Sequence, residues 1–160
     1  MKILITGGTL DKQYNPLNGT LVFNQSSITD MLAQSRNTLE IDIDTLMLKD
    51  SLEMNDDDRL LLSKTCNECD DKHVIITHGT DTMVESAQII AAQLAPNKTV
   101  VLLGAMVPYQ FKRSDALFNL GCAITAVQIL PAGVYITMNG QVFDYRKVQK
   151  NRTLGKFVSV

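Results

Sequence analysis

Short runs rich in β-branched residues recur along the chain, and most are separated by amphipathic segments of helical length. The runs are Lys2–Thr6, Leu39–Leu46, His73–His78, Thr99–Leu103 and Gly133–Met138. The amphipathic segments are Ser27–Ser35, Asp56–Cys66, Asp81–Leu94 and Ser114–Leu130. Strands that are apolar throughout and alternate with helices indicate a parallel sheet, because each parallel connection needs a crossover element.

The pattern therefore predicts an α/β fold. We expect a doubly wound, mostly parallel sheet in a three-layer sandwich of the flavodoxin-like or Rossmann-like kind. Near the end of the chain the alternation changes, because Asn139-Gly140 separates two apolar runs. An Asn-Gly pair in that setting is a strong signal for a two-residue hairpin turn, so we expect a C-terminal β-hairpin that is antiparallel to its neighbour.

Composition limits the possible classes of protein. The 160 residues are 45% hydrophobic and 20% charged with a net charge of −2, which is typical of one ordinary globular domain spanning residues 1–160. No basic excess favours nucleic acid, and no apolar run approaches the roughly 20 residues of a membrane span. The first apolar run is too short for a signal peptide, and three cysteines are too few for a disulfide framework, so we expect a cytoplasmic protein.

The stretch from Gly7 to about Ser26 shows no periodic pattern. A connection of that length in a compact domain is more often a lid or binding loop than a disordered segment. We therefore expect a lid, with disorder as the alternative.

Glycines and hydroxyls follow four of the predicted strands. These segments are Gly7–Thr9, Lys49–Ser51, Gly79–Thr82 and Gly104–Met106. Ligands of open parallel sheets bind beyond the carboxyl ends of the strands, so we expect a site where these segments meet. Glycine lets the backbone approach a ligand, and a threonine hydroxyl at a loop tip can act as a nucleophile or hydrogen-bond donor.

Other interpretations compete at the same positions. Thr80 and Asp81 could simply cap the helix that follows them. The Gly7–Thr9 segment could hold a phosphate, but it lacks the spacing of the dinucleotide and triphosphate motifs. His78 ends an apolar strand, where a structural histidine is more common than a general base.

Three further motifs have structural explanations. Cys66 and Cys69 have the spacing of half a metal or redox site, but no second pair accompanies them, so we predict no metal. The acidic run Asp56–Asp58 is typical of a solvated helix N-terminus. We assign Met106 and Phe118 to the core from their apolar character and spacing.

Several segments together resemble the bacterial-type L-asparaginases. They are Ile3–Leu10, His78–Met83, Leu103–Pro108, Ser114–Leu120 and Asp144–Thr153, in family order along nearly the whole chain. The resemblance implies that Thr9 is the primary nucleophile and that Thr80, Asp81 and Lys150 form a second hydroxyl–acid–amine group. It also implies that Tyr14 is the tyrosine of a mobile loop.

The resemblance further implies how a substrate is held. Ser51 falls where the family binds the substrate's carboxylate, and Asp81 would pair with the α-ammonium group. The substrate-binding residues that we expect are Gly8, Asp50, Ser51, Gly79, Thr80, Asp81 and Ala105. Leu52 departs from the family pattern, because many members have glutamine there.

The chemistry of these residue types fits the implied roles. A threonine hydroxyl needs a base, and Lys150 can serve only when its amine is neutral, whereas a nearby Asp81 favours the charged amine. The lysine charge can instead stabilise the developing alkoxide. Backbone N–H groups of Gly8–Thr9 and Gly79–Thr80 are candidate oxyanion donors.

The expected function is thus hydrolysis of L-asparagine, with L-glutamine as a second candidate substrate and no cofactor. Family members usually have a second domain, and a neighbouring subunit contributes an acidic residue to the site. Since this chain ends about where the first domain ends, we expect a homodimer or homotetramer to complete the site. The alternatives are an amino-acid-binding module without turnover and a subunit of a tRNA-dependent amidotransferase.

Overall fold

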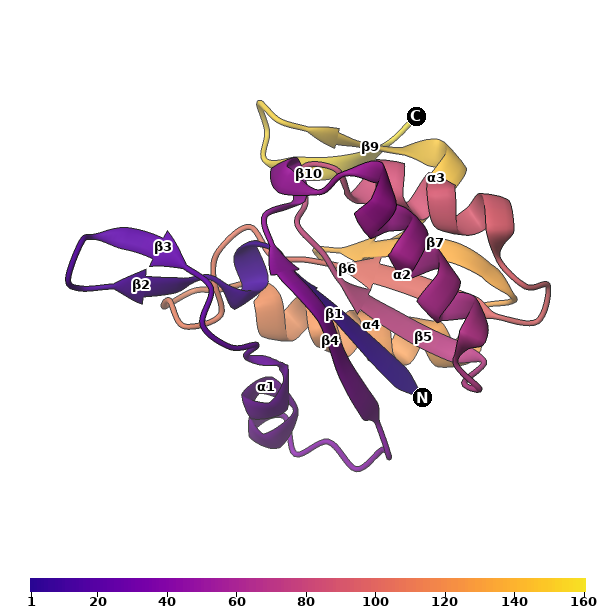
Figure 1. Cartoon of the computed structure of the whole chain (residues 1–160), viewed down its shortest axis with the longest axis horizontal. Coiled ribbons are helices and arrows are strands. Elements are labelled where there is room, and N and C mark those ends of the chain that lie inside the picture. Colours follow the sequence, from indigo (N-terminus) through magenta and orange to yellow (C-terminus); the bar gives the residue numbers. More distant parts are fainter.

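Five parallel strands and one antiparallel edge strand form the central sheet of the computed structural model, which describes residues 1–160 (Figure 1). The strand order is β4-β1-β5-β6-β7-β8. The strands are β1 (Lys2–Gly7), β4 (Asp42–Lys49), β5 (His73–Thr77), β6 (Thr99–Leu103), β7 (Gly133–Met138) and β8 (Gln141–Asp144). This is the flavodoxin-like order with one antiparallel strand added, so the predicted fold class is confirmed.

Each face of the sheet is covered by two helices. Leu4 and the other residues that point to its side pack against α2 (Asp56–Glu68) and α3 (Met83–Gln93). Ile3 and Ile5 point to the opposite face and pack against α1 (Ile28–Gln34) and α4 (Ala116–Ile129). Because successive strand residues point to opposite faces, continuous apolar strands build two separate cores.

The β6–α4–β7 crossover has the opposite hand to the other three. The crossovers through α2 (β4 to β5) and α3 (β5 to β6) run in one direction across the sheet and lie on one face. The crossover through α1 (β1 to β4) runs in the opposite direction and lies on the opposite face. Since both direction and face are reversed, all three crossovers have the same hand. Helix α4 continues in the direction of α3 but lies on the α1 face. Right-handed crossovers are the rule, so β6–α4–β7 is the exception, and residues 104–115 carry the chain around to that face.

Most predicted elements are confirmed, with shifts at their ends. Strand β4 starts at Asp42 instead of Leu39, because Lys2 at the start of β1 pairs with Asp42 and fixes the register. Helix α3 starts at Met83 instead of Asp81, since Thr82 takes the N-cap position. The predicted hairpin joins β7 to β8, and Asn139 and Gly140 both have positive φ, as a type I′ turn requires.

Residues 7–26 contain more structure than the sequence pattern predicts. A 3₁₀ turn (Thr9–Asp11) is followed by a hairpin of β2 (Gln13–Asn15) and β3 (Thr20–Val22) that extends away from the sheet (Figure 1). The buried Asp11 carboxylate connects the start of this segment to its end at residues 26 and 27. Its Oδ1 accepts hydrogen bonds from Ser26 Oγ at 2.9 Å and Ser27 N at 2.8 Å.

A second hairpin that the sequence pattern did not predict follows β8. It consists of β9 (Val148–Asn151) and β10 (Lys156–Ser159). Val148 and Phe157 are buried in the core on the α2–α3 face, so the hairpin is fixed to the body of the molecule. Lys150 lies opposite Phe157 in this hairpin.

The assignment of Phe118 to the core is wrong. Phe118 is 59% exposed, whereas Leu120 on the same helix is buried. The helix is apolar around most of its circumference, so its sequence does not show which side faces the sheet. No helix of the structure is both long and apolar enough to cross a membrane.

Candidate active site

The site predicted at the strand ends lies at the switch point of the sheet. The chain leaves β1 toward β4 on one side and leaves β5 toward β6 on the other. Open α/β sheets bind ligands beyond the carboxyl ends of the strands at such a point. Residues 7–9 and 78–81 form the two switch-point loops, which follow β1 and β5.

Two glycines let three loops touch through their backbones. Gly8 has φ of 77°, and its N–H donates a hydrogen bond to Lys49 O at 2.9 Å. A Cβ atom on Gly8 would lie 2.4 Å from Gly79 N, and one on Gly79 would lie 2.5 Å from Ser51 Oγ. Only glycine fits at both positions, so the structure brings Gly8, Gly79 and Ser51 together as predicted.

The hydroxyl, carboxylate and amine of the predicted second group are in direct contact. Lys150 Nζ donates hydrogen bonds to Thr80 Oγ1 at 2.8 Å and to Asp81 Oδ1 at 2.9 Å. Thr80 is buried and Asp81 is half-buried. Because Thr80 Oγ1 accepts from Lys150, its own proton can be donated elsewhere.

The Asp50–Ser51 loop adds a second ion pair and a free hydroxyl. Lys12 Nζ donates a hydrogen bond to Asp50, and the Leu52 N–H donates to the same carboxylate at 3.0 Å. Burial of Asp50 opposes ionisation, but these two bonds and the nearby charges of Lys12 and Lys150 lower its pKa. Ser51 Oγ is buried against Gly79 and has no hydrogen-bond partner within the chain, so its capacity to form hydrogen bonds is unused.

Thr9, Ala105 and Tyr14 differ in how the structure places them. Thr9 is half-buried and directly follows Gly8. Ala105 follows β6 and is fully buried in the core. Tyr14 is 55% exposed on the β2–β3 hairpin opposite Leu21. Thus Thr9 and Ala105 adjoin the switch-point loops, while Tyr14 belongs to the projecting hairpin.

His78 holds the second loop from inside the protein. Its Nδ1–H donates to Gly79 O at 2.7 Å, so its Nε2 accepts from the Ser86 hydroxyl at 2.8 Å. Complete burial, helped by the charge of Arg59, lowers the pKa of His78 to about 4. A neutral imidazole with both nitrogens occupied positions the backbone, in agreement with its assignment as a structural histidine.

Sequence reasoning missed several residues around the site. Asp115 accepts hydrogen bonds from Met106 N at 3.0 Å and Val107 N at 3.1 Å, and so holds the loop after β6. Asn119 donates to Gly104 O at 2.9 Å. Arg152 lies 3.8 Å from Asp81. The position of Asp115 at the start of a predicted helix was the one available signal.

The remaining motifs have structural roles. Asp58 and the preceding Asn55 form a capping box at the start of α2, and Asp58 also pairs with Lys49, so the acidic run belongs to a helix N-terminus as predicted. Cys66 is buried in the core, and burial raises the pKa of its thiol to about 12. Cys69 ends the same helix, with its sulfur 3.6 Å from Lys98 Nζ.

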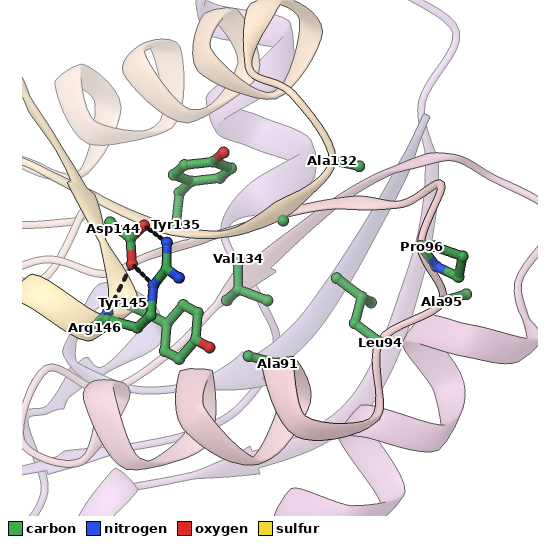
Figure 2. Close-up of a pocket in the computed structure, with 11 residues that line it drawn as sticks. Ala91, Leu94, Ala95, Pro96, Ala132, Val134, Tyr135, Asp144, Tyr145 and Arg146 are labelled. Carbon is green, nitrogen blue, oxygen red and sulfur yellow. Dashed lines mark hydrogen bonds and ion pairs between the residues drawn. The ribbon is translucent and has the colours of Figure 1, made fainter.

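A separate hollow of about 270 Å³ lies between the end of α3 and the β7–β8 region (Figure 2). Alanine, leucine, proline and valine account for six of its 11 lining residues. Its acid and its base, Asp144 and Arg146, are hydrogen-bonded to each other, as the dashed lines of Figure 2 show. This pairing lowers the pKa of Asp144 to about 2 and leaves no free charged group for chemistry.

Comparisons with known proteins agree with the geometry of the switch point. The chain is 33% identical to the probable periplasmic L-asparaginase of Haemophilus influenzae over 160 residues, covering 94% of this chain and 46% of that protein. It is 31% identical to a subunit of the glutamyl-tRNA(Gln) amidotransferase of Archaeoglobus fulgidus, covering 96% of this chain and 39% of that protein. The chain thus spans less than half the length of these two relatives.

Solved structures show the same fold. The thermostable L-asparaginase of Thermococcus kodakarensis superposes with a TM-score of 0.86 at 25% identity, over all of this chain and 51% of that one. The probable cytoplasmic L-asparaginase of Campylobacter jejuni gives a TM-score of 0.86 at 30% identity, over 99% of this chain and 52% of its own.

A family model described as "Asparaginase, N-terminal" matches residues 1–157, which is nearly the whole chain. The match includes both switch-point loops and Lys150. With closely packed glycine loops, a paired threonine and lysine, and this fold, the chain belongs to the asparaginase family through its N-terminal domain.

Proposed function

We propose that the chain is an amidohydrolase that converts L-asparagine to L-aspartate and ammonia, with L-glutamine as a second candidate substrate. One observation carries the proposal: Lys150 Nζ contacts Thr80 Oγ1 and Asp81 Oδ1 together, beside the Gly8–Thr9 turn. A protein that only binds amino acids has no need for a lysine on a buried threonine hydroxyl. The names of the H. influenzae and T. kodakarensis relatives support the same substrate.

Thr9 is the nucleophile in this proposal. Its hydroxyl attacks the amide carbon as the hydroxyl proton passes to a base. The carbon–nitrogen bond then breaks as this proton is delivered to the amide nitrogen, which leaves as ammonia. Water then hydrolyses the threonine ester and releases aspartate. Next to the reacting carbonyl, the group of Thr80, Asp81 and Lys150 transfers protons. The positive charge of Lys150 stabilises the developing alkoxide.

The remaining site residues bind the substrate. The unpartnered Ser51 hydroxyl holds the carboxylate, and Asp81 faces the α-nitrogen. Backbone groups of Gly8, Gly79 and Ala105 lie around the reacting amide, and Asp50 orients the loop that carries Ser51. Tyr14 approaches from the hairpin. No cofactor or metal takes part in this mechanism.

Assembly and location complete the proposal. Residues 1–160 form one asparaginase N-terminal-type domain, because both cores share one sheet. A homodimer or homotetramer would cover the switch-point loops with a second copy. The name of the C. jejuni neighbour favours the cytoplasm, while the H. influenzae relative is named as periplasmic.

One alternative function has support of its own. The A. fulgidus relative belongs to a glutamyl-tRNA(Gln) amidotransferase, so the same site could release ammonia for a partner protein. That function predicts little ammonia release by the isolated chain. A binding module predicts an asparagine-induced rise in melting temperature without turnover.

Ammonia release from L-asparagine and L-glutamine by purified wild type, Thr9→Ala and Thr80→Val tests the proposal. Thr29→Ala is the control, because Thr29 is exposed on α1. We expect wild type and the control to release ammonia, and each site variant to be slower by about 10²-fold or more. Equal turnover by all four proteins would show that the assignment is wrong.

A further inference from the structure

Thr82 occupies the N-cap position of α3 but does not cap that helix. A threonine at this position usually accepts a hydrogen bond from an N–H group of the first turn. The Thr82 side chain makes no such bond. Its hydroxyl instead donates to Ser51 O at 2.8 Å and accepts from a guanidinium nitrogen of Arg59 in α2 at 3.3 Å. These two bonds, the Thr82 link, join α2 and the start of α3 to the segment that follows β4.

Arg59 also lacks the partners that a buried guanidinium group usually has. The residue is only 9% exposed, and its Nε has no hydrogen-bond partner. Asp56 forms an ion pair with it at 3.5 Å, but this aspartate is 88% exposed, so water screens the attraction. A buried charge with an unsatisfied donor is unfavourable. Thr82 and Arg59 thus both lack better local interactions, which is expected where a contact serves function more than stability.

The Thr82 link holds Ser51 against the loop that carries the proposed reacting group. The same loop already touches Ser51 at Gly79, where an added Cβ atom would lie 2.5 Å from Ser51 Oγ. Thr80 and Asp81 lie between these two points of contact in the chain. Two attachments to one short loop restrict both the distance and the angle between the segments. The fold therefore sets the span from Ser51 to Thr80.

We propose that Thr82, supported by Arg59, is a positioning residue that sets the length of the substrate that the site accepts. This inference rests on the proposed amidohydrolase function, in which Ser51 holds the substrate carboxylate and Thr80 acts beside the side-chain amide. Asparagine and glutamine differ by one methylene between these two groups. A fixed span favours one of the two lengths, and we expect it to favour the shorter one, asparagine. Without the link, the Ser51 segment can move relative to Thr80 and accommodate either length.

Other contacts of the Ser51 segment do not depend on the Thr82 link. The Gly8 N–H donates to Lys49 O at 2.9 Å, and Leu52 N donates to the Asp50 carboxylate at 3.0 Å. These bonds keep the segment folded and next to the first switch-point loop. Loss of the link should therefore change selectivity without abolishing activity.

The test measures kcat/KM for ammonia release from L-asparagine and from L-glutamine. Wild type is compared with Thr82→Val, which loses the hydroxyl at nearly the same volume, and with Thr82→Ser, which keeps it. Thr65→Val is the control. The Thr65 hydroxyl also donates to a backbone carbonyl, that of Leu61 at 2.9 Å, but it lies toward the end of α2 that is far from Arg59.

We expect wild type, Thr82→Ser and the control to prefer asparagine by about tenfold or more, within the range that one methylene can produce. Thr82→Val should bring this ratio to within about threefold of one, because kcat/KM falls for asparagine and not for glutamine. Arg59→Met should move the ratio in the same direction by a smaller factor. A purely structural role of Thr82 would slow both reactions equally and leave the ratio unchanged.

Two results overturn the inference while the proposed function survives. They are a wild type that does not discriminate between the two amides and a ratio that Thr82→Val leaves unchanged. If Thr82→Val does not fold, Thr82→Ala, which leaves space instead of a methyl group beside Ser51 O, decides the inference by the same ratio.

If wild type releases ammonia from neither amide, the proposed function fails instead. Calorimetric affinities of wild type and Thr82→Val for L-asparagine and L-glutamine then decide the inference. Selective binding of asparagine by wild type that the variant loses supports it, and equal selectivity in the two proteins refutes it.

Discussion

The switch-point loops and the β2–β3 hairpin flank the same residue, Thr9, but they are built differently. At the switch point, Gly8, Gly79 and Ser51 are packed so closely that one added methyl group on either glycine would overlap a neighbour. In the hairpin, Tyr14 and Leu17 are largely exposed, and the fixed contacts lie at its base. The site therefore has a rigid half, the switch-point loops, which holds reacting groups. Its other half, the β2–β3 hairpin, has few packing constraints.

This difference predicts opposite responses to mutation. Substitutions in the rigid half should destabilise the whole fold, because its backbones touch one another. Substitutions of exposed side chains in the hairpin should leave stability unchanged, so that of Tyr14 should act on turnover alone.

The largest expected effect is that of Gly8→Ala. Gly8 has φ of 77° and ψ of −179°, and its new Cβ would meet the backbone of Gly79 at 2.4 Å. We expect a loss of more than about 4 kcal/mol in the free energy of unfolding, or no folded protein. Gly121→Ala is the control, because a Cβ there meets nothing within 4 Å and should add about 0.5–1 kcal/mol in a helix. Urea unfolding measures both, and a Gly8→Ala midpoint equal to wild type would contradict the close packing.

A smaller effect should appear as a pH dependence of stability. The pKa of His78 is lowered to about 4 in the folded protein, so between pH 6.5 and 4 the unfolded chain binds a proton that the native state does not. The free energy of unfolding is then complete above about pH 6.5 and falls by roughly 3 kcal/mol as the pH drops to 4. Unfolding of wild type and His78→Gln across this range tests the prediction. His73→Gln is the control, and an equal slope in all three proteins would exclude His78 as the cause.

Asp11 gives an intermediate case, because it joins the hairpin to the body. Burial raises the pKa of Asp11, against the opposing bonds from Ser27 N and the Ser26 hydroxyl. Asp11→Ala loses both bonds and should cost about 1–3 kcal/mol. Asp11→Asn keeps an oxygen acceptor and removes a buried charge, so it should be as stable as wild type. Thermal unfolding of both variants distinguishes them, and equal losses would mean that the charge itself is needed.

The smallest effect on stability should be that of Tyr14→Phe. The side chain is 55% exposed, so we expect the free energy of unfolding to stay within about 0.5 kcal/mol of wild type. Turnover should nevertheless fall by about tenfold or more if the hydroxyl reaches the substrate. Leu17→Ala, at the exposed tip of the hairpin, is the control for both measurements. Unchanged turnover in Tyr14→Phe would remove this tyrosine from the mechanism.

The same contrast explains what the sequence could predict. Continuous apolar strands specify a parallel sheet, and a parallel sheet brings its strand ends together, so the meeting of Gly8, Ser51, Gly79 and Thr80 followed from pattern alone. The β2–β3 hairpin has short, polar strands that bury little surface, and no periodic signal marks them. Phe118 was misassigned because α4 is apolar on its exposed side as well.

The place of Lys150 could not be predicted from local pattern. It reaches the site because Val148 and Phe157 attach the β9–β10 hairpin to a core built from distant residues. The resemblance to a known family identified Lys150, while periodicity did not. The resemblance includes Arg152 in its last segment but gives it no role, because its partner Asp81 lies 71 positions earlier in the chain and only the folded structure joins them.

The most direct test of the central claim is a double-mutant cycle on kcat for L-asparagine with Thr80→Val, Lys150→Met and both together. The contact at 2.8 Å implies that the two side chains act as one unit. Each single change should then lower kcat by about 10²–10⁴-fold, and the double variant should be no slower than the slower single one. Losses that multiply in the double variant, or single variants as fast as wild type, would contradict the account.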